Sequence, residues 1–226
     1  MGIIKYTIIR SNRKTMTLRV TPEVTVEVRA PLKLPTAEID AFVQSKQSWI
    51  VEHLVIQDAR REQREAFAPR YGDTVTFLGR QLPIVAAGRA AVDGGRFCIP
   101  AGLNSKRIKE ACVLLYKAEA RRIITEKVGA FAAAMNVRPS AVRINSATAR
   151  WGSCSAKNSL NFSWRLVMAD EDIVDYVVVH ELAHIMEHNH SGRFWAVVGG
   201  VLPDYRALDK RLKPLQEKLA REDWSV

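Results

Sequence analysis

Alternation of apolar and polar positions in the first thirty residues predicts short antiparallel strands. β-Branched residues dominate a run over residues 3–9, and Val24, Val26 and Val28 alternate with polar neighbours. Such alternation places successive side chains on opposite faces of a strand. Thr21-Pro22-Glu23 fits a turn between two of these strands.

Apolar positions next recur at helical spacing from Pro35 into the charged segment near residue 65. Strand patterns return at residues 74–78, 82–86 and 96–99, where glycines mark the turns. The change of pattern near residues 100–104 divides the chain. We therefore expect a β-rich N-terminal part with a helix over residues 1–103 and a second domain over 104–226.

The second part of the chain is predominantly helical in pattern. A single apolar stripe predicts a long helix from about Ser105 to Asn136. The other expected elements are strands at residues 137–145 and 159–164, and helices at 170–188, 191–201 and 203–221. The whole pattern predicts an α+β fold.

Composition places the chain among ordinary globular proteins. Of its 226 residues, 47% are hydrophobic and 26% charged, which is enough to bury a core. No stretch approaches the roughly 18–20 apolar residues of a membrane helix, and the N-terminus lacks the features of a signal peptide. Cys98, Cys112 and Cys154 form no C-x-x-C pair, which fits a reducing compartment. We expect a cytoplasmic protein without a membrane partner.

A formal net charge of +10 leaves two interpretations open. The 34 basic and 24 acidic residues are spread along the chain, as is typical of general solubility. An excess of positive charge also fits a polyanion such as nucleic acid. No nucleic-acid-binding motif accompanies the charge, so nucleic acid is a possible but secondary partner.

The most specific indication of function is the motif His180-Glu181-Leu182-Ala183-His184, whose residue types and spacing suit a metal site. On a helix, residues four apart lie on one face, one turn from each other, so two imidazoles can reach one metal ion. Glu181 would then lie beside a metal-bound water without occupying a ligand position. Acidic residues at 170–172 favour a helix start. The β-branched run 177–179 has poor helix propensity, so burial must override it.

A catalytic zinc ion needs a third protein ligand and an open fourth position. His188 would lie about 12 Å along the helix axis from His180, which is too far for one ion. His190 can reach the metal if the helix ends first, with Asn189 in a left-handed C-cap position and Ser191 capping the next helix. The motif therefore predicts a zinc site formed by His180, His184 and His190.

This ligand set predicts hydrolysis of peptide bonds. Zinc would lower the pKa of bound water, and Glu181 would act as general base and then pass the proton to the leaving amine. The spacing of the three histidines matches that of metzincins, although Glu187 stands where those proteins have glycine. Tyr176, Tyr205, Arg150 and His188 are candidates for a second group that stabilises the oxyanion.

A second constellation, Arg150-Trp151-Gly152-Ser153-Cys154, precedes the motif. Gly152 permits close approach of another chain, and a strand edge here could bind an extended peptide substrate as an added strand. The segment could equally be a packing element with Trp151 in the core.

Together these segments resemble the YgjP-like metallopeptidase domain family, which is similar to the SprT-like and WLM metallopeptidases. The resemblance also extends to the N-terminal part of the chain. It is carried by the segments 150–154, 175–184, 189–191 and 194–195, and more weakly by 10–14, 24–28, 42–43 and 49–50. It implies a zincin-like catalytic domain, with an active-site helix and a small antiparallel sheet. It implies zinc on His180, His184 and His190, with Glu181 as the base.

Two other functions compete with a peptidase. One is a basic, nucleic-acid-associated zinc protein without peptidase turnover. The other is a zinc hydrolase that acts on a non-peptide amide. A structural zinc site is usually closed by four protein ligands. Three histidines with an adjacent glutamate therefore favour catalysis.

Overall fold

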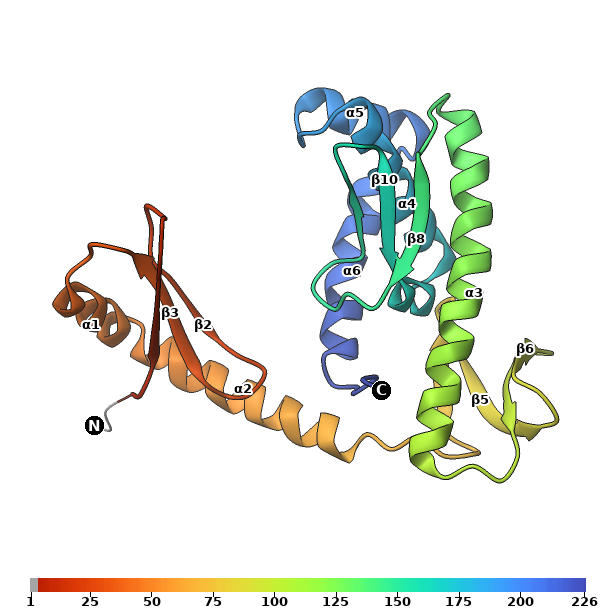
Figure 1. Cartoon of the computed structure of the whole chain (residues 1–226), viewed down its shortest axis with the longest axis horizontal. Helices are drawn as coiled ribbons and strands as arrows, with labels where there is room; N and C mark the ends of the chain where they lie inside the picture. Colours follow the sequence, from red (N-terminus) through yellow and green to blue (C-terminus); the bar gives the residue numbers. More distant parts are fainter. Residues whose placement is uncertain (1–3) are drawn as a thin grey trace. The chain divides into compact units, whose positions relative to one another are not determined.

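The computed structural model describes residues 4–226 and divides into two compact units (Figure 1). The first unit contains the residues up to Phe67 together with Lys218–Asp223, and the second contains Ala68–Glu217 with Trp224–Val226. Ile3, part of the first expected strand, lies outside the described residues.

A three-stranded sheet and two helices form most of the first unit. The elements are β1 (Thr7–Ser11), β2 (Thr17–Val20), β3 (Val26–Pro31), α1 (Thr36–Ser45) and α2 (Gln47–Ala66). The strand order is β1-β3-β2, with β1 parallel and β2 antiparallel to β3. The expectation of purely antiparallel strands is therefore wrong, and the single helix expected after Pro35 is broken at Lys46. Alternate residues of β3 are buried against α1, namely Val26, Val28 and Ala30.

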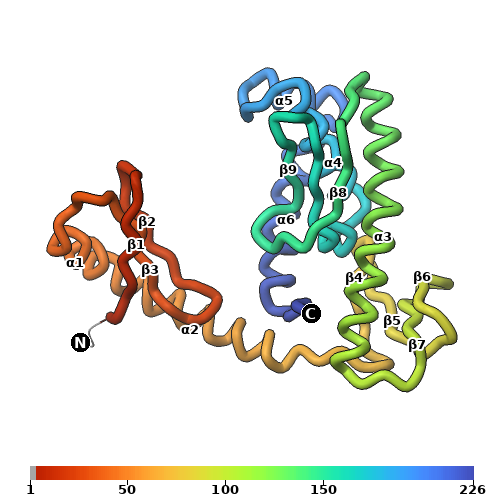
Figure 2. The backbone as a smooth tube through the Cα atoms, viewed as in Figure 1, coloured from red at the N-terminus to blue at the C-terminus, as the bar shows by residue number. Residues whose placement is uncertain are grey.

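The second unit begins with a four-stranded sheet beside a long helix. The elements are β4 (Thr74–Phe77), β5 (Arg80–Ala87), β6 (Ala91–Asp93), β7 (Arg96–Pro100) and α3 (Ser105–Ala134). Figure 2 traces these strands next to the N-terminal half of α3, and the strand order is β4-β5-β7-β6. Asn104 caps α3 by accepting a hydrogen bond from the backbone N–H of Arg107. The buried hydroxyl of Tyr116 donates to the carbonyl of Thr76 at 2.7 Å and joins helix to sheet.

A second small sheet and three helices complete this unit. The elements are β8 (Ala141–Asn145), β9 (Gly152–Cys154), β10 (Ser159–Ser163), the 3-10 helix η1 (Trp164–Met168), α4 (Glu171–Met186), α5 (Gly192–Val201) and α6 (Tyr205–Leu219). The α+β class is confirmed. The sheet order is β8-β10-β9, with β8 parallel and β9 antiparallel to β10. The sheet is thus mixed rather than antiparallel, because the edge strand β8 runs parallel to the central strand β10, whereas the other edge strand, β9, runs antiparallel to it.

Helix α4 is anchored on several sides, which fixes the position of the HExxH motif. It packs against α3, α5 and β9, and its buried residues include the whole run Val177–Val179. Burial therefore overrides the poor helix propensity of these residues. Lys127 of α3 adds ion pairs to Glu171 and Asp175 at 2.9 and 2.7 Å. Asp170 occupies the N-cap position but makes no capping hydrogen bond; its carboxylate pairs with Arg211 instead.

The contacts divide the chain near Phe67, whereas the sequence pattern changes near residue 103. Strand β7 packs on α3, so residues 68–103 share a unit with the helical part that follows. The division at residues 103/104 stays a prediction about independently folding domains. Among the described helices, none has both the length and the hydropathy needed to cross a membrane.

Limited proteolysis distinguishes the two boundaries. We expect trypsin to cut the native chain first after the exposed Arg70, because this residue lies at the junction of the two compact units. Mass spectrometry of the earliest fragments provides the measurement. A first cut after Lys106 or Arg107 would instead support the division after residue 103.

Candidate metal centre

Helix α4 places three of the four candidate residues, and the turn after it places the fourth. His180, Glu181 and His184 lie within the last two turns of the helix. The helix ends at Glu187, which is extended (φ −137°, ψ 105°). Asn189 is not among the residues with positive φ, so the predicted left-handed C-cap there is wrong.

The chain returns to the site through a tight turn centred on His190. The backbone N–H of Ser191 donates to the carbonyl of Asn189 at 2.7 Å, which closes a three-residue turn. The Ser191 hydroxyl then accepts a hydrogen bond from the N–H of Phe194 and caps α5, as predicted. A cap and a turn, rather than a left-handed residue, therefore bring His190 back toward α4.

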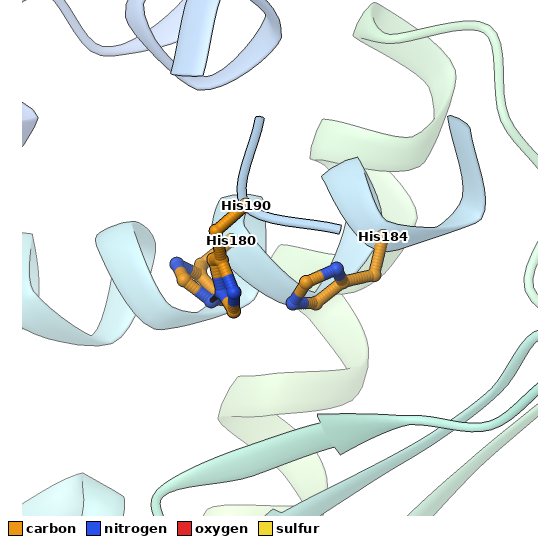
Figure 3. A group of neighbouring side chains, drawn as sticks. All are labelled: His180, His184 and His190. Carbon is orange, nitrogen blue, oxygen red and sulfur yellow. Dashed lines mark hydrogen bonds between the residues drawn. The ribbon is translucent and has the colours of Figure 1, made fainter. Parts of the chain in front are cut away.

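The imidazoles of His180, His184 and His190 gather at one place (Figure 3). One ligand atom from each ring lies within 4.8 Å of the other two. The Nε2 atoms of His180 and His190 are 3.0 Å apart, and Nδ1 of His184 lies 3.2 Å from the carbonyl oxygen of Glu187. His188 does not belong to the group. The structure thus brings together the three histidines that the sequence singled out.

This arrangement fits a tetrahedral zinc ion. With Zn–N bonds of about 2.0–2.1 Å, two nitrogen ligands lie about 3.3 Å apart, close to the 3.0 Å between His180 and His190. The contact of His184 Nδ1 with a carbonyl oxygen leaves its Nε2 for a metal, and ligating histidines commonly have such a partner. Three nitrogen donors with an open fourth position match a catalytic zinc site.

Burial favours the neutral form of two of these rings, which is the form that binds a metal. It lowers the pKa of His180 to about 4, with smaller contributions from His184 and His190. Burial also lowers the pKa of His184. Neutral imidazole is the ligating form, so no proton has to be removed from His180 at pH 7 before a metal binds.

Glu181 is a buried carboxylic acid with an unused oxygen. Only 6% of the residue is exposed, and Oε2 has no hydrogen-bond partner within the described chain. Burial raises the pKa of Glu181 to about 7, while the positive charge of Arg150 acts in the opposite direction. A buried polar atom without a partner is costly, and such atoms are found at functional sites.

Strand β9 lies directly against the side chain of Glu181. A Cβ atom added at Gly152 would lie 2.6 Å from both Cγ and Oε1 of Glu181, closer than real Cβ contacts allow. Glycine is thus required here for the strand to approach the carboxylate. The segment 150–154 therefore borders the site.

Two of the candidate oxyanion-stabilising groups have other partners. The hydroxyl of the buried Tyr176 donates to Asp209 at 2.9 Å, and the hydroxyl of Tyr205 accepts from Arg206 at 3.2 Å. Arg150 is exposed and acts electrostatically on Glu181. The sequence did not predict that Tyr176 and Phe194 contact the histidines, whereas their ring centroids lie 5.8 and 4.9 Å from that of His180. Tyr176 stands four residues before His180, a spacing that places both on one helix face.

A helix with two histidines one turn apart, a glutamate between them and a third histidine nearby is characteristic of the metallopeptidase class. Within this class, the chain belongs to the YgjP-like family: the model of the YgjP-like metallopeptidase domain matches residues 14–214. The family predicted from the sequence is thereby confirmed.

Among solved structures, the chain is similar to the metallopeptidase zymogen of Pyrococcus abyssi abylysin. The sequence identity is 22% and the TM-score 0.39, over 44% of this chain and 97% of that chain. No curated protein shows significant similarity to this chain.

Proposed function

We propose that the protein is a zinc metallopeptidase in which His180, His184 and His190 hold the metal and Glu181 is the general base. One observation supports this most strongly: three imidazoles converge, and the residue that follows His180 in α4 is a buried carboxylic acid with an unpartnered oxygen. The family supplies the peptidase class, and the donor set argues for zinc, which favours imidazole ligands and tetrahedral geometry.

In the proposed reaction, the metal and Glu181 have separate roles. When bound, zinc acidifies water and polarises the peptide carbonyl. Glu181 accepts the proton of the attacking water at a carboxylate oxygen and delivers it to the nitrogen of the leaving amine. Burial raises the pKa of Glu181 from its usual value to about 7. A general base is most effective when its pKa lies near the working pH.

Strand β9 offers a place for the substrate backbone. It pairs with β10 on one side only, so it is the edge of its sheet, and it packs against α4 next to Glu181. An extended peptide can add to such an edge through backbone hydrogen bonds. We propose a peptide or protein as the substrate; nucleic acid as a further partner stays a prediction.

Metal analysis of single-histidine variants tests this site. We expect about one zinc per chain after purification with zinc, lost in His190→Ala and retained in His188→Ala, because only His190 belongs to the group of imidazoles. Elemental analysis of the purified proteins gives the stoichiometry, and circular dichroism verifies that each variant is folded.

The matched pair of variants makes the outcome decisive. Both change an exposed histidine that follows the end of α4, so general effects on the loop are shared. Absence of zinc from the wild type, or its loss in His188→Ala alone, would reject the proposed ligand set.

A further inference from the structure

One phenylalanine touches all three imidazoles of the candidate metal centre. Phe194, in the first turn of α5, is fully buried. Its ring centroid lies 4.9, 4.6 and 4.7 Å from the centroids of His180, His184 and His190. The rings of His180 and His190 meet it edge to face, at 71° and 70°. A single rigid side chain therefore limits the rotation of all three rings.

Trp195 also contacts His190 and is itself held in place by a neighbouring ring. The two ring centroids lie 5.7 Å apart with an angle of 30° between the planes. Trp195 also stacks on Tyr205, the first residue of α6, at 5.1 Å and 12°. His190, Trp195 and Tyr205 thus form a row of three rings that ends on a helix.

Two of the three imidazoles lack the partner that usually orients a metal ligand. Ligating histidines commonly donate their second ring N–H to a carboxylate, a carbonyl or water. Nδ1 of His180 is buried without any partner in the described chain. Among the described residues, the only ring-nitrogen contact of His190 is made by Nε2, which lies 3.0 Å from Nε2 of His180. Only His184 has a backbone carbonyl near its second nitrogen.

His190 needs external support more than the other two rings. His180 and His184 are fixed to a buried helix, whereas His190 is exposed and lies in a three-residue turn between helices. A flexible ligand must lose conformational freedom when the metal binds, which weakens binding. Contacts that order the ring beforehand reduce that cost.

We propose that Phe194 and Trp195 are positioning residues that hold the imidazoles in the metal-binding arrangement, in place of hydrogen-bonded partners. Phe194 orients all three rings, and Trp195, stacked on Tyr205, orients His190. The inference rests on the proposed metal site and concerns what sets its affinity. Aromatic contacts around the ligands also exclude water, which strengthens the electrostatic attraction between the metal and the nitrogens.

Zinc affinities of a small set of variants test this proposal. We expect zinc to bind at least about 10-fold more weakly to Phe194→Leu and Trp195→Leu, the loss typical when an outer partner of a ligand is removed. Trp195→Phe keeps an aromatic ring and should stay close to the wild type. Competition with a chromophoric chelator gives the dissociation constants. The visible spectrum of the Co²⁺-substituted protein reports directly on ligand geometry and should change in the two leucine variants.

Phe97→Leu serves as the matched control. Phe97 is equally buried in the same unit, but it packs on Phe77 and Tyr116 rather than on a histidine. The control should lose thermal stability and retain the zinc affinity and Co²⁺ spectrum of the wild type. If it lost affinity as much as Phe194→Leu, the effect would be general destabilisation and the proposal would be rejected.

A further pair of variants covers the case in which Phe194→Leu does not fold. Tyr205 is half-buried and reaches His190 only through Trp195, so Tyr205→Leu should weaken zinc binding while Tyr205→Phe should not. Wild-type affinity in both Tyr205→Leu and Trp195→Leu would overturn the inference. A wild-type protein that binds no zinc would instead reject the proposed metal site itself.

Discussion

Glu181→Gln is expected to lower peptide hydrolysis by about 10²–10⁴-fold, the usual contribution of a general base, without loss of zinc. The amide keeps the size of the side chain but cannot accept the proton of the attacking water. Turnover can be measured as new amino termini released from casein or from a fluorogenic peptide library. Zinc content should equal that of the wild type, because Glu181 does not belong to the group of candidate ligands.

Glu126→Gln is a suitable control for this substitution. Glu126 lies on the exposed side of α3, and its one ion pair among the described residues is a long surface pair with Arg122, at 3.7 Å. Such a pair contributes little to stability, so activity should not change. Full activity of Glu181→Gln would show that another group accepts the proton.

Gly152→Ala is expected to reduce activity by about 100-fold, the effect of a displacement of about 1 Å at a reacting group. The new methyl group would overlap with Cγ and Oε1 of Glu181 at 2.6 Å. Since Glu181 is buried, either its carboxylate or strand β9 has to move. We expect kcat to fall and zinc to remain bound, as measured with the same peptides and by elemental analysis.

Gly129→Ala tests whether loss of any glycine has this effect. Gly129 lies in α3, and apart from the adjacent residues and backbone of its own helix no described atom lies within 4 Å of an added Cβ. Alanine should therefore be tolerated there and raise helix stability slightly. Wild-type kcat in Gly152→Ala would mean that the close approach of β9 to Glu181 has no role in the reaction.

The sequence predicted those parts of the fold that follow from local periodicity. The expected long helix from Ser105 to about Asn136 ends at Ala134 in the structure, and the helix of the HExxH motif spans Glu171–Met186. Histidines four residues apart on a helix must share a face. The grouping of His180 with His184 was therefore fixed by spacing alone.

Features that depend on tertiary contacts were predicted less well. The direction of β1 and β8 relative to their neighbours is set by how the chain crosses each sheet, which periodicity does not encode. The predicted left-handed Asn189 was wrong because Glu187 already leaves the helix in an extended conformation. The common contact of Phe194 with three histidines arises only when α5 packs on α4.

The packing around α4 has a consequence for the protein when it lacks its metal. Two candidate ligands and the proposed base belong to a helix that is already packed against α3, α5 and β9. Metal binding then adds its free energy to an existing fold, unlike in zinc fingers, which are unfolded without the ion. We therefore expect the proposed activity to be lost and regained reversibly as zinc is removed and resupplied. A chain without its metal should stay folded but inactive and regain activity when zinc is added, rather than misfold and be degraded.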